Sequence, residues 1–206
     1  MTQQLQNLLS AVDIPADWIG LREVDERTTI RFIRDGHPQT NARTKSHGIM
    51  VEVLVDGQFG YFGTNDINQN GIQKAAKKAY QQAKLAARYA IHFFTIAARP
   101  KAIGTYKSPY KHAFNKSSPG VLNDLMIKAS KVLKVSDKVI STNAFAQIVE
   151  SKHGFISSNG SNISQDFLMV TFDLVATAQD GSNINTRSAG GLRGLSRQIG
   201  AELFDE

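Results

Sequence analysis

The chain has 206 residues, of which 41% are hydrophobic and 20% are charged. These proportions are those of a folded protein, and a chain of this length buries roughly 70% of the surface that its unfolded form exposes, so intrinsic disorder is excluded. The absence of cysteine excludes disulfide bonds, thiolate catalysis and cysteine-ligated zinc. The formal net charge of +6 is unevenly spread: residues 74–138 carry a net charge of +12, and the remaining residues carry −6.

The beginning of the sequence and its hydropathy indicate a cytoplasmic protein. The first five residues, MTQQL, have neither a basic start nor a sustained apolar stretch, so we expect no signal peptide. The most apolar window, residues 89–98, contains His92 and is too short to cross a bilayer. We therefore expect no contact with a membrane.

Two turn signals divide residues 1–65 into strands. The pairs Asp35-Gly36 and Asp56-Gly57 tolerate the positive φ of tight two-residue turns, and β-branched and aromatic residues flank them. The predicted strands are residues 28–34, 48–55 and 58–62. The first third of the chain is therefore β-rich.

Residues 66–135 are predicted to form a helix, a loop and a second helix. Apolar residues recur at helical spacing between residues 66 and 98, and Pro100 ends the pattern. Most of them are Ala, which permits close approach to a sheet. This face comprises Ile72, Ala75, Ala76, Ala79, Ala83, Ala86, Ala87, Ala90 and Phe94.

The second helix is expected to begin at Ser118 as its N-cap, with Pro119 in the first turn. Between the two helices, residues 101–117 are predicted to form a loop that is rich in Lys and aromatic side chains. A loop of this length is usually functional.

Residues 136–206 are again β-rich. Asn159-Gly160 and Asp180-Gly181 mark turns, and residues 168–179 alternate between apolar and polar side chains as a half-buried strand does. The order predicts an α+β fold in a single domain, residues 1–206, in which a mixed or antiparallel sheet with hairpins packs against one long and one shorter helix.

The motifs of a complete active site are missing. The five His residues, at positions 37, 47, 92, 112 and 153, lack the paired spacing of a zinc-peptidase helix. The glycine-rich segment 190–194 matches neither the dinucleotide fingerprint nor the Walker A pattern, and no Ser lies in Gly-x-Ser-x-Gly. We therefore expect no catalytic residue and no metal ligand in this chain.

The basic region 74–138 leaves two interpretations open. Tyr106, Tyr110 and Phe114 alternate with Lys in the loop, and such a mixture can stack on bases and contact phosphates of single-stranded nucleic acid. Lys is also common on solvated helix faces, and these aromatics follow no strand pattern. We favour solvated faces, and a stand-alone protein- or nucleic-acid-binding module is the alternative function.

Several segments together resemble the N-terminal half of the TldD/PmbA proteins, a metallopeptidase family also named modulators of DNA gyrase. Residues 48–66, GIMVEVLVDGQFGYFGTND, are similar to the family signature of an apolar strand, an Asp-Gly turn and Thr-Asn-Asp before an Ala-rich helix. Residues 30–36, 155–160 and 187–191 continue the match in the expected order. The resemblance covers residues 20–206.

The resemblance implies a peptidase whose zinc-type metal is bound by a His-Glu-x-x-x-His helix in the second half of the family's chain. That motif does not occur here, so we expect no cofactor in this chain and no activity of the chain alone. Whether it corresponds to the metal-bearing or the metal-free subunit of the family stays open.

The resemblance implies two roles for this chain. It helps to enclose a peptide or unfolded protein substrate, and it assembles with a TldD/PmbA-type subunit as a homo- or hetero-oligomer. Arg187, Gly190 and Gly191 are the candidate substrate-binding residues. Gly lets a backbone approach closely, and Arg can bind a carboxylate or a carbonyl.

Overall fold

The computed structural model describes residues 2–114, 119–189 and 194–204. Within these residues the chain forms three α-helices and a mostly antiparallel eight-stranded sheet, which confirms the predicted α+β class. No helix in the described ranges combines the length and the apolar character needed to cross a bilayer.

The chain divides into two compact units. Unit 1 comprises Met1–Glu26, Ser46–Lys107 and Ser151–Asp166, and unit 2 comprises Arg27–Lys45, Ser108–Glu150 and Phe167–Glu206. Four long strands contribute residues to both units. The expectation of one domain stays a prediction, and each unit is described by itself below.

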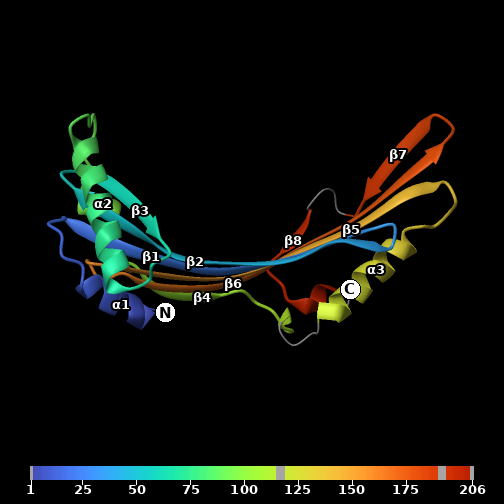
Figure 1. Ribbon diagram of the computed structural model, residues 1–206, viewed down its shortest axis with the longest axis horizontal. Coiled ribbons are helices and arrows are strands. Elements are labelled where there is room, and N and C mark those ends of the chain that lie inside the picture. Colours follow the sequence, from blue (N-terminus) through green and yellow to red (C-terminus); the bar gives the residue numbers. More distant parts are fainter. Residues whose placement is uncertain (1, 115–118, 190–193, 205–206) are drawn as a thin grey trace. The chain divides into compact units, whose positions relative to one another are not determined.

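The sheet is built from long strands joined by short turns (Figure 1). The strands are β1 Trp18–Arg34, β2 His37–Val55, β3 Gln58–Thr64, β4 Ile103–Lys107, β5 Val139–Ser157, β6 Asn162–Asp180, β7 Asn183–Ser188 and β8 Leu195–Arg197. The order is β3-β2-β1-β5-β6-β4, and β7 and β8 also pair with β6. β3 is antiparallel to β2, and β4 is parallel to β6.

All four predicted turn signals lie at turns. Asp35 and Asp56 have a φ of 50°, and each is followed by a Gly with a positive φ. The other two turns place Gly160 at a φ of 90° and Gly181 at 58°. These backbone conformations are open mainly to Gly, Asn and Asp, so the turn residues determine where the strands end.

Two helices build the core of unit 1. The buried residues Leu5 and Leu8 of α1 (Thr2–Ser10) lie in one cluster with α2 (Gln69–Ala87), which contacts β3 (Figure 1). Gly60 permits this contact, because a Cβ there would overlap the carbonyl oxygen of Ala79. The predicted α2 residues Ile72, Ala75, Ala76, Ala79 and Ala83 are all buried.

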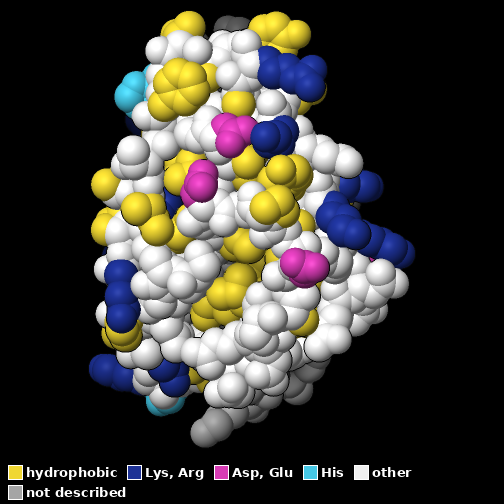
Figure 2. Space-filling view, turned by 90° about the vertical axis from the view of Figure 1, so that its left-hand side faces the viewer, with side chains coloured by type: hydrophobic (Ala, Val, Ile, Leu, Met, Phe, Trp, Pro, Cys, Tyr) yellow, Lys and Arg dark blue, Asp and Glu magenta, His cyan; other side chains and the backbone are white. Residues whose placement is uncertain are grey.

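The predicted helix 66–98 is wrong at its C-terminal end. α2 ends at Ala87, and only a short 3₁₀ helix, η1 (Ile96–Ala98), follows. A tertiary contact overrides the helical pattern here: the N–H of Phe94 donates to the carbonyl of Gly57, 2.8 Å away. Phe94, the last residue of the predicted apolar face, is 41% exposed, and the nearby Tyr89, Ile91 and Phe93 are exposed still more. Figure 2 shows hydrophobic side chains at the upper end of the face that it presents.

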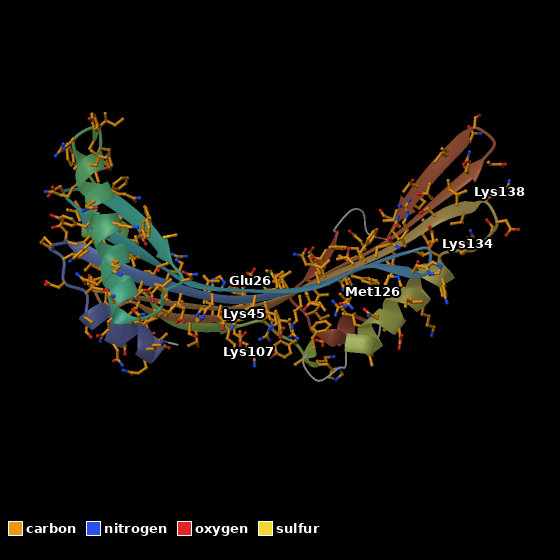
Figure 3. The ribbon with its side chains drawn as sticks, in the orientation of Figure 1. Glu26, Lys45, Lys107, Met126, Lys134 and Lys138 are labelled. Carbon is orange, nitrogen blue, oxygen red and sulfur yellow. The ribbon has the colours of Figure 1, made fainter. Side chains whose placement is uncertain are left out.

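One helix, α3 (Pro119–Val132), covers the strands of unit 2. Its start at Pro119 agrees with the prediction, and the expected N-cap, Ser118, lies outside the described residues. Met126 is fully buried against Ile33 of β1 and Ala144 of β5, and Figure 3 places it between the helix and the strands.

The predicted loop 101–117 is partly a strand. Residues Ile103–Lys107 form β4, which pairs with Asn162–Asp166 of β6. The segment has only five residues and contains Gly104, so its strand formers Ile103, Thr105 and Tyr106 did not stand out as a strand. The N–H of Asn162 donates to the carbonyl of Ala102, and Ala102 N–H donates to the Ser161 hydroxyl, so the turn before β6 positions β4.

Candidate functional site

A large hollow lies within unit 1, on the sheet face opposite α2. We call it the arginine hollow. Its volume is about 950 Å³. It is lined by Arg22 and Val24 of β1, residues 46–50 and Glu52 of β2, residues 61–65 at the end of β3, and Arg99.

Strand alternation explains which side chains reach the arginine hollow. Ile49 and Val51 of β2 belong to the core under α1 and α2, so Met50 and Glu52 face the other way. Gly63 leaves space on this face, whereas a Cβ on Gly48 would lie 3.0 Å from the carbonyl oxygen of Thr64. A Cβ on Gly63 would have a single neighbour beyond its own segment, the Met50 Cε atom at 3.9 Å.

A charged cluster forms one wall of the hollow. The Nε and Nη2 groups of Arg99 both donate to Oε1 of Glu52, and the Nε distance is 2.8 Å. Arg99 Nη2 also donates to the Tyr61 hydroxyl, 3.2 Å away, and its guanidinium carbon lies 4.3 Å from the centre of the Phe59 ring. The Glu52 side chain is only 7% exposed, so it depends on this cation for compensation.

This geometry shifts two pKa values. The hydrogen bond to Glu52 is the main cause that raises the pKa of Arg99, and the negative charge of Glu52 adds to it, while burial acts in the opposite direction. The pKa of Tyr61 is also raised, first by burial and then by the nearby Glu52 carboxylate. At neutral pH the wall is therefore an ion pair with a neutral phenol.

The turn between β5 and β6 holds Arg99 in place. The Asn159 side-chain amide donates to the carbonyl of Arg99, 2.8 Å away. Asn159 Oδ1 accepts from the indole N–H of Trp18 at 3.0 Å, and the Ser158 hydroxyl accepts from the N–H of Ile19 at 3.0 Å. Asn159, which belongs to the segment 155–160 that resembles the family, thus holds Arg99, sixty positions earlier in the chain.

Arg22 of β1 also lines the hollow. Its guanidinium carbon lies 5.4 Å from the centre of the Phe155 ring. Phe155 in turn packs on Trp18, with ring centres 6.4 Å apart, and Trp18 is fully buried. A cation above an aromatic face is held in position without losing its charge.

The end of the signature, Thr64-Asn65-Asp66, leads from the arginine hollow into α2. The N–H of Asp66 donates to the Thr64 hydroxyl at 3.1 Å, which closes a local turn. Asn68 is the N-cap, and its side-chain oxygen accepts from the N–H of Gly71 at 2.9 Å. These three residues therefore connect the hollow with the helix behind the sheet.

Of the sequence-predicted site residues, Arg187 is not among those that line the arginine hollow. Arg187 is an exposed residue of β7 in unit 2, in register with Ala176 of β6. Gly190 and Gly191 lie outside the described residues. Their role in binding stays a prediction.

The histidines do not form a metal cluster. His47 pairs with the buried Glu23 across β1 and β2, with Nε2 and Oε1 2.8 Å apart. Among the residues that the structure describes, no three His, Asp or Glu side chains lie close enough to hold a metal ion.

The basic region 74–138 belongs to both units. Its residues up to Lys107 lie in unit 1, and those from Lys111 onward lie in unit 2. Three of its cations pair with acids outside the region: Lys84 with Asp56, Arg99 with Glu52, and Lys138 with Asp180. Figure 3 shows Lys134 and Lys138 near the β5 end of unit 2. Nucleic-acid binding stays an untested alternative.

Comparison with known families identifies the signature segment. Residues 21–83 match the model of the PmbA/TldA metallopeptidase domain 1. The predicted resemblance to the TldD/PmbA family is confirmed. This matched segment supplies most of the arginine hollow, from Arg22 to Asn65, and also α2 as far as Ala83.

Solved structures share the fold over nearly the whole chain. A candidate modulator of DNA gyrase from Thermotoga maritima MSB8 has a TM-score of 0.71 at 15% identity, covering 90% of this chain and 41% of that one. A second candidate modulator, from Bacteroides thetaiotaomicron VPI-5482, has a TM-score of 0.70 at 16% identity and coverages of 90% and 43%. TldE from Thermococcus kodakarensis has 0.68 at 13%, with coverages of 95% and 43%. The chain thus spans less than half the length of these proteins, and no curated protein matches it.

The sequence did not single out Arg22, Glu52, Tyr61 or Arg99. One signal was available, since Glu52 is a charged residue within the apolar β2 segment of the TldD/PmbA-like signature. A buried carboxylate requires a nearby cation, but the sequence does not reveal which of the many Lys and Arg residues provides it.

Proposed function

We propose that this chain acts as the N-terminal domain of a TldD/PmbA-type metallopeptidase, where it helps to enclose a peptide or unfolded substrate and to assemble with a second family subunit. The observation that carries the proposal is the composition of the arginine hollow. The same segment that matches the family model, residues 21–83, forms its floor and most of its walls.

The hollow suits an extended peptide. It combines apolar lining from Val24 and Met50 with the polar groups of Tyr61, Thr64 and Asn65, and side chains of a peptide need both. Strand addition at β3 is disfavoured, because Gln82 of α2 already accepts the N–H of Tyr61 at 3.2 Å. We therefore expect contacts across the face of the sheet.

Assembly with a family subunit is supported by the comparisons. The matched model is described as a metallopeptidase domain, and TldE is among the structural neighbours. The sequence of this chain contains no His-Glu-x-x-x-His motif. The proposal therefore assigns binding and assembly to this chain and peptide-bond cleavage to the metal-bearing region of the assembly.

The test combines the chain with a TldD/PmbA-type subunit that carries the His-Glu-x-x-x-His motif. We expect the two to co-elute in size-exclusion chromatography and the chain to increase cleavage of an unfolded peptide. Gly63→Leu should abolish the increase, because a leucine there fills the hollow. Gly104→Leu is the matched control, since a Cβ on Gly104 of β4 has no neighbour within 4 Å. The absence of both co-elution and any rate change would contradict the proposal.

A further inference from the structure

The cations that line the arginine hollow differ in whether an acid pairs with them. Its wall cation Arg99 is compensated by Glu52, and His47 is paired with Glu23. Arg22 lines the same hollow and forms no hydrogen bond or ion pair with an acid among the described residues. Among the cations that line the hollow, Arg22 is therefore the one without an acidic partner in the described part of the chain.

Arg22 is pre-organised to bind an anion. Its guanidinium carbon lies 5.4 Å from the centre of the Phe155 ring, which itself packs on the buried Trp18. Such stacking restricts the side chain and leaves its N–H donors free for a partner in the plane. A guanidinium presents these donors in a fork that matches the two oxygens of a carboxylate.

The surroundings select a singly charged ligand. A dianionic phosphate would leave one negative charge unpaired in a hollow that already contains the Glu52 carboxylate. The adjoining Val24 and Met50 side chains are apolar and favour an organic anion over a bare ion. Single-stranded nucleic acid would need several uncompensated cations along a groove, and the lining offers one.

We propose that Arg22 binds a carboxylate of the enclosed peptide. This proposal rests on the proposed function, and it adds the chemical group that the hollow recognises. The carboxylate belongs either to the C-terminus of the peptide or to an Asp or Glu side chain within it, and both have the same planar, singly charged geometry. Arg99 does not take this role, because both donors that face the hollow are held by Glu52.

The experiment measures peptide affinity by isothermal titration calorimetry with the full chain. Three peptides share one apolar core sequence. The first has a free C-terminal carboxylate, the second is amidated, and the third is amidated but contains an internal Glu. We expect the amidated peptide to bind about tenfold or more weakly than the better of the two acidic peptides. Whichever acidic peptide binds more tightly shows whether the hollow prefers a C-terminal carboxylate or a Glu side chain.

Variants assign the effect to Arg22. Arg22→Gln should remove the difference between acidic and amidated peptides, and Arg22→Lys should restore part of it, since Lys keeps the charge without the fork. Arg43→Gln removes an exposed arginine of β2 in unit 2 and should leave the difference unchanged. Near-ultraviolet circular dichroism shows that each variant is folded.

Equal binding of acidic and amidated peptides would overturn the carboxylate proposal, as would undetectable binding of all three. An unchanged preference in Arg22→Gln would do the same. The two proposals fail separately. If the chain changes cleavage by its family partner but shows no carboxylate preference, only the Arg22 assignment is wrong. If the preference depends on Arg22 but cleavage never changes, only the peptidase role is wrong.

Discussion

In both units a helix packs against the sheet, but the side chains at the contact differ in size. In unit 1, α2 approaches β3 through alanines, and Gly60 lies under Ala79. In unit 2, α3 packs through the large, flexible side chain of Met126, and polar residues are buried beside it. Small residues fix a close distance between backbones, whereas a long unbranched side chain fills an irregular space.

The turns of the two units also differ. The Asp35-Gly36 turn of unit 2 is held by hydrogen bonds: Gly36 N–H donates to the Ser130 hydroxyl, and Asp35 accepts from the N–H of Thr142. The Asp56-Gly57 turn of unit 1 is covered by Phe93, and Asp56 pairs with Lys84 at the surface. The turn of unit 2 thus uses a buried side-chain hydroxyl, whereas an aromatic ring and a hydrogen bond from the N–H of Phe94 to the Gly57 carbonyl hold the turn of unit 1.

The largest expected effect is in unit 2. Met126→Ala removes a fully buried side chain, so we expect the free energy of unfolding to fall by about 2–5 kcal/mol. Urea denaturation measures the loss, and hydrogen exchange should show that amides of α3 lose more protection than those of α2. An equal loss in both helices would mean that the units do not differ in stability.

A smaller effect tests the close packing of unit 1. Gly60→Ala places a Cβ against the Ala79 backbone, and relief of this overlap should cost about 1–3 kcal/mol of unfolding free energy. The control is Gly63→Ala on the same strand, where the new Cβ meets only the Met50 side chain. Identical urea midpoints for the two variants would contradict the argument from shape.

The polar network of unit 2 is tested by Thr142→Val, which preserves the shape of the side chain. The Thr142 and Ser130 hydroxyl oxygens are 2.9 Å apart and buried, so the variant should lose about 1 kcal/mol of unfolding free energy. Thermal unfolding monitored by circular dichroism measures the change. Unaltered stability would show that the Asp35-Gly36 turn does not need this contact.

The smallest effect is expected at Glu202 and depends on pH. Burial acts to raise its pKa, but hydrogen bonds from the backbone N–H groups of Lys111 and His112 outweigh it and lower the pKa from 4.5 to about 2. A lowered pKa in the folded state stabilises the protein above pH 4.5, and this contribution is lost as the pH falls toward 2.

Glu202→Gln should therefore lower the melting temperature at pH 7. The difference in melting temperature between the variant and the unsubstituted chain should disappear as the pH falls from 4.5 to 2. Melting curves recorded at several pH values measure it. A difference that stays constant across this range would show that the charge of Glu202 does not stabilise unit 2.

The local features of the fold could be predicted from sequence, because neighbouring residues determine them. Three Asp-Gly pairs and one Asn-Gly pair marked four turns, and alternation marked the β6 segment. The end of α2 could not be predicted, since its apolar pattern continues to Phe94 and the helix is ended by a contact with the distant Gly57. Propensity yields to tertiary contacts of this kind.

The candidate site was less accessible to sequence reasoning. Arg99 meets Glu52 across forty-seven positions and Asn159 across sixty, and no local pattern encodes such pairs. The resemblance covered the segment that contains Gly63, although it gave no reason for a glycine at that position. The reason lies in the space that Gly63 leaves above the sheet.

Trp18 makes the surroundings of Arg22 directly observable. It is the single tryptophan of the chain and is buried. Its ring packs on Phe155, and the Arg22 guanidinium lies over the Phe155 ring. Its intrinsic fluorescence therefore reports on one location in the molecule. A ligand that displaces Arg22 or Phe155 is expected to change the tryptophan emission, so ligand binding can be followed in real time by intrinsic fluorescence without a label.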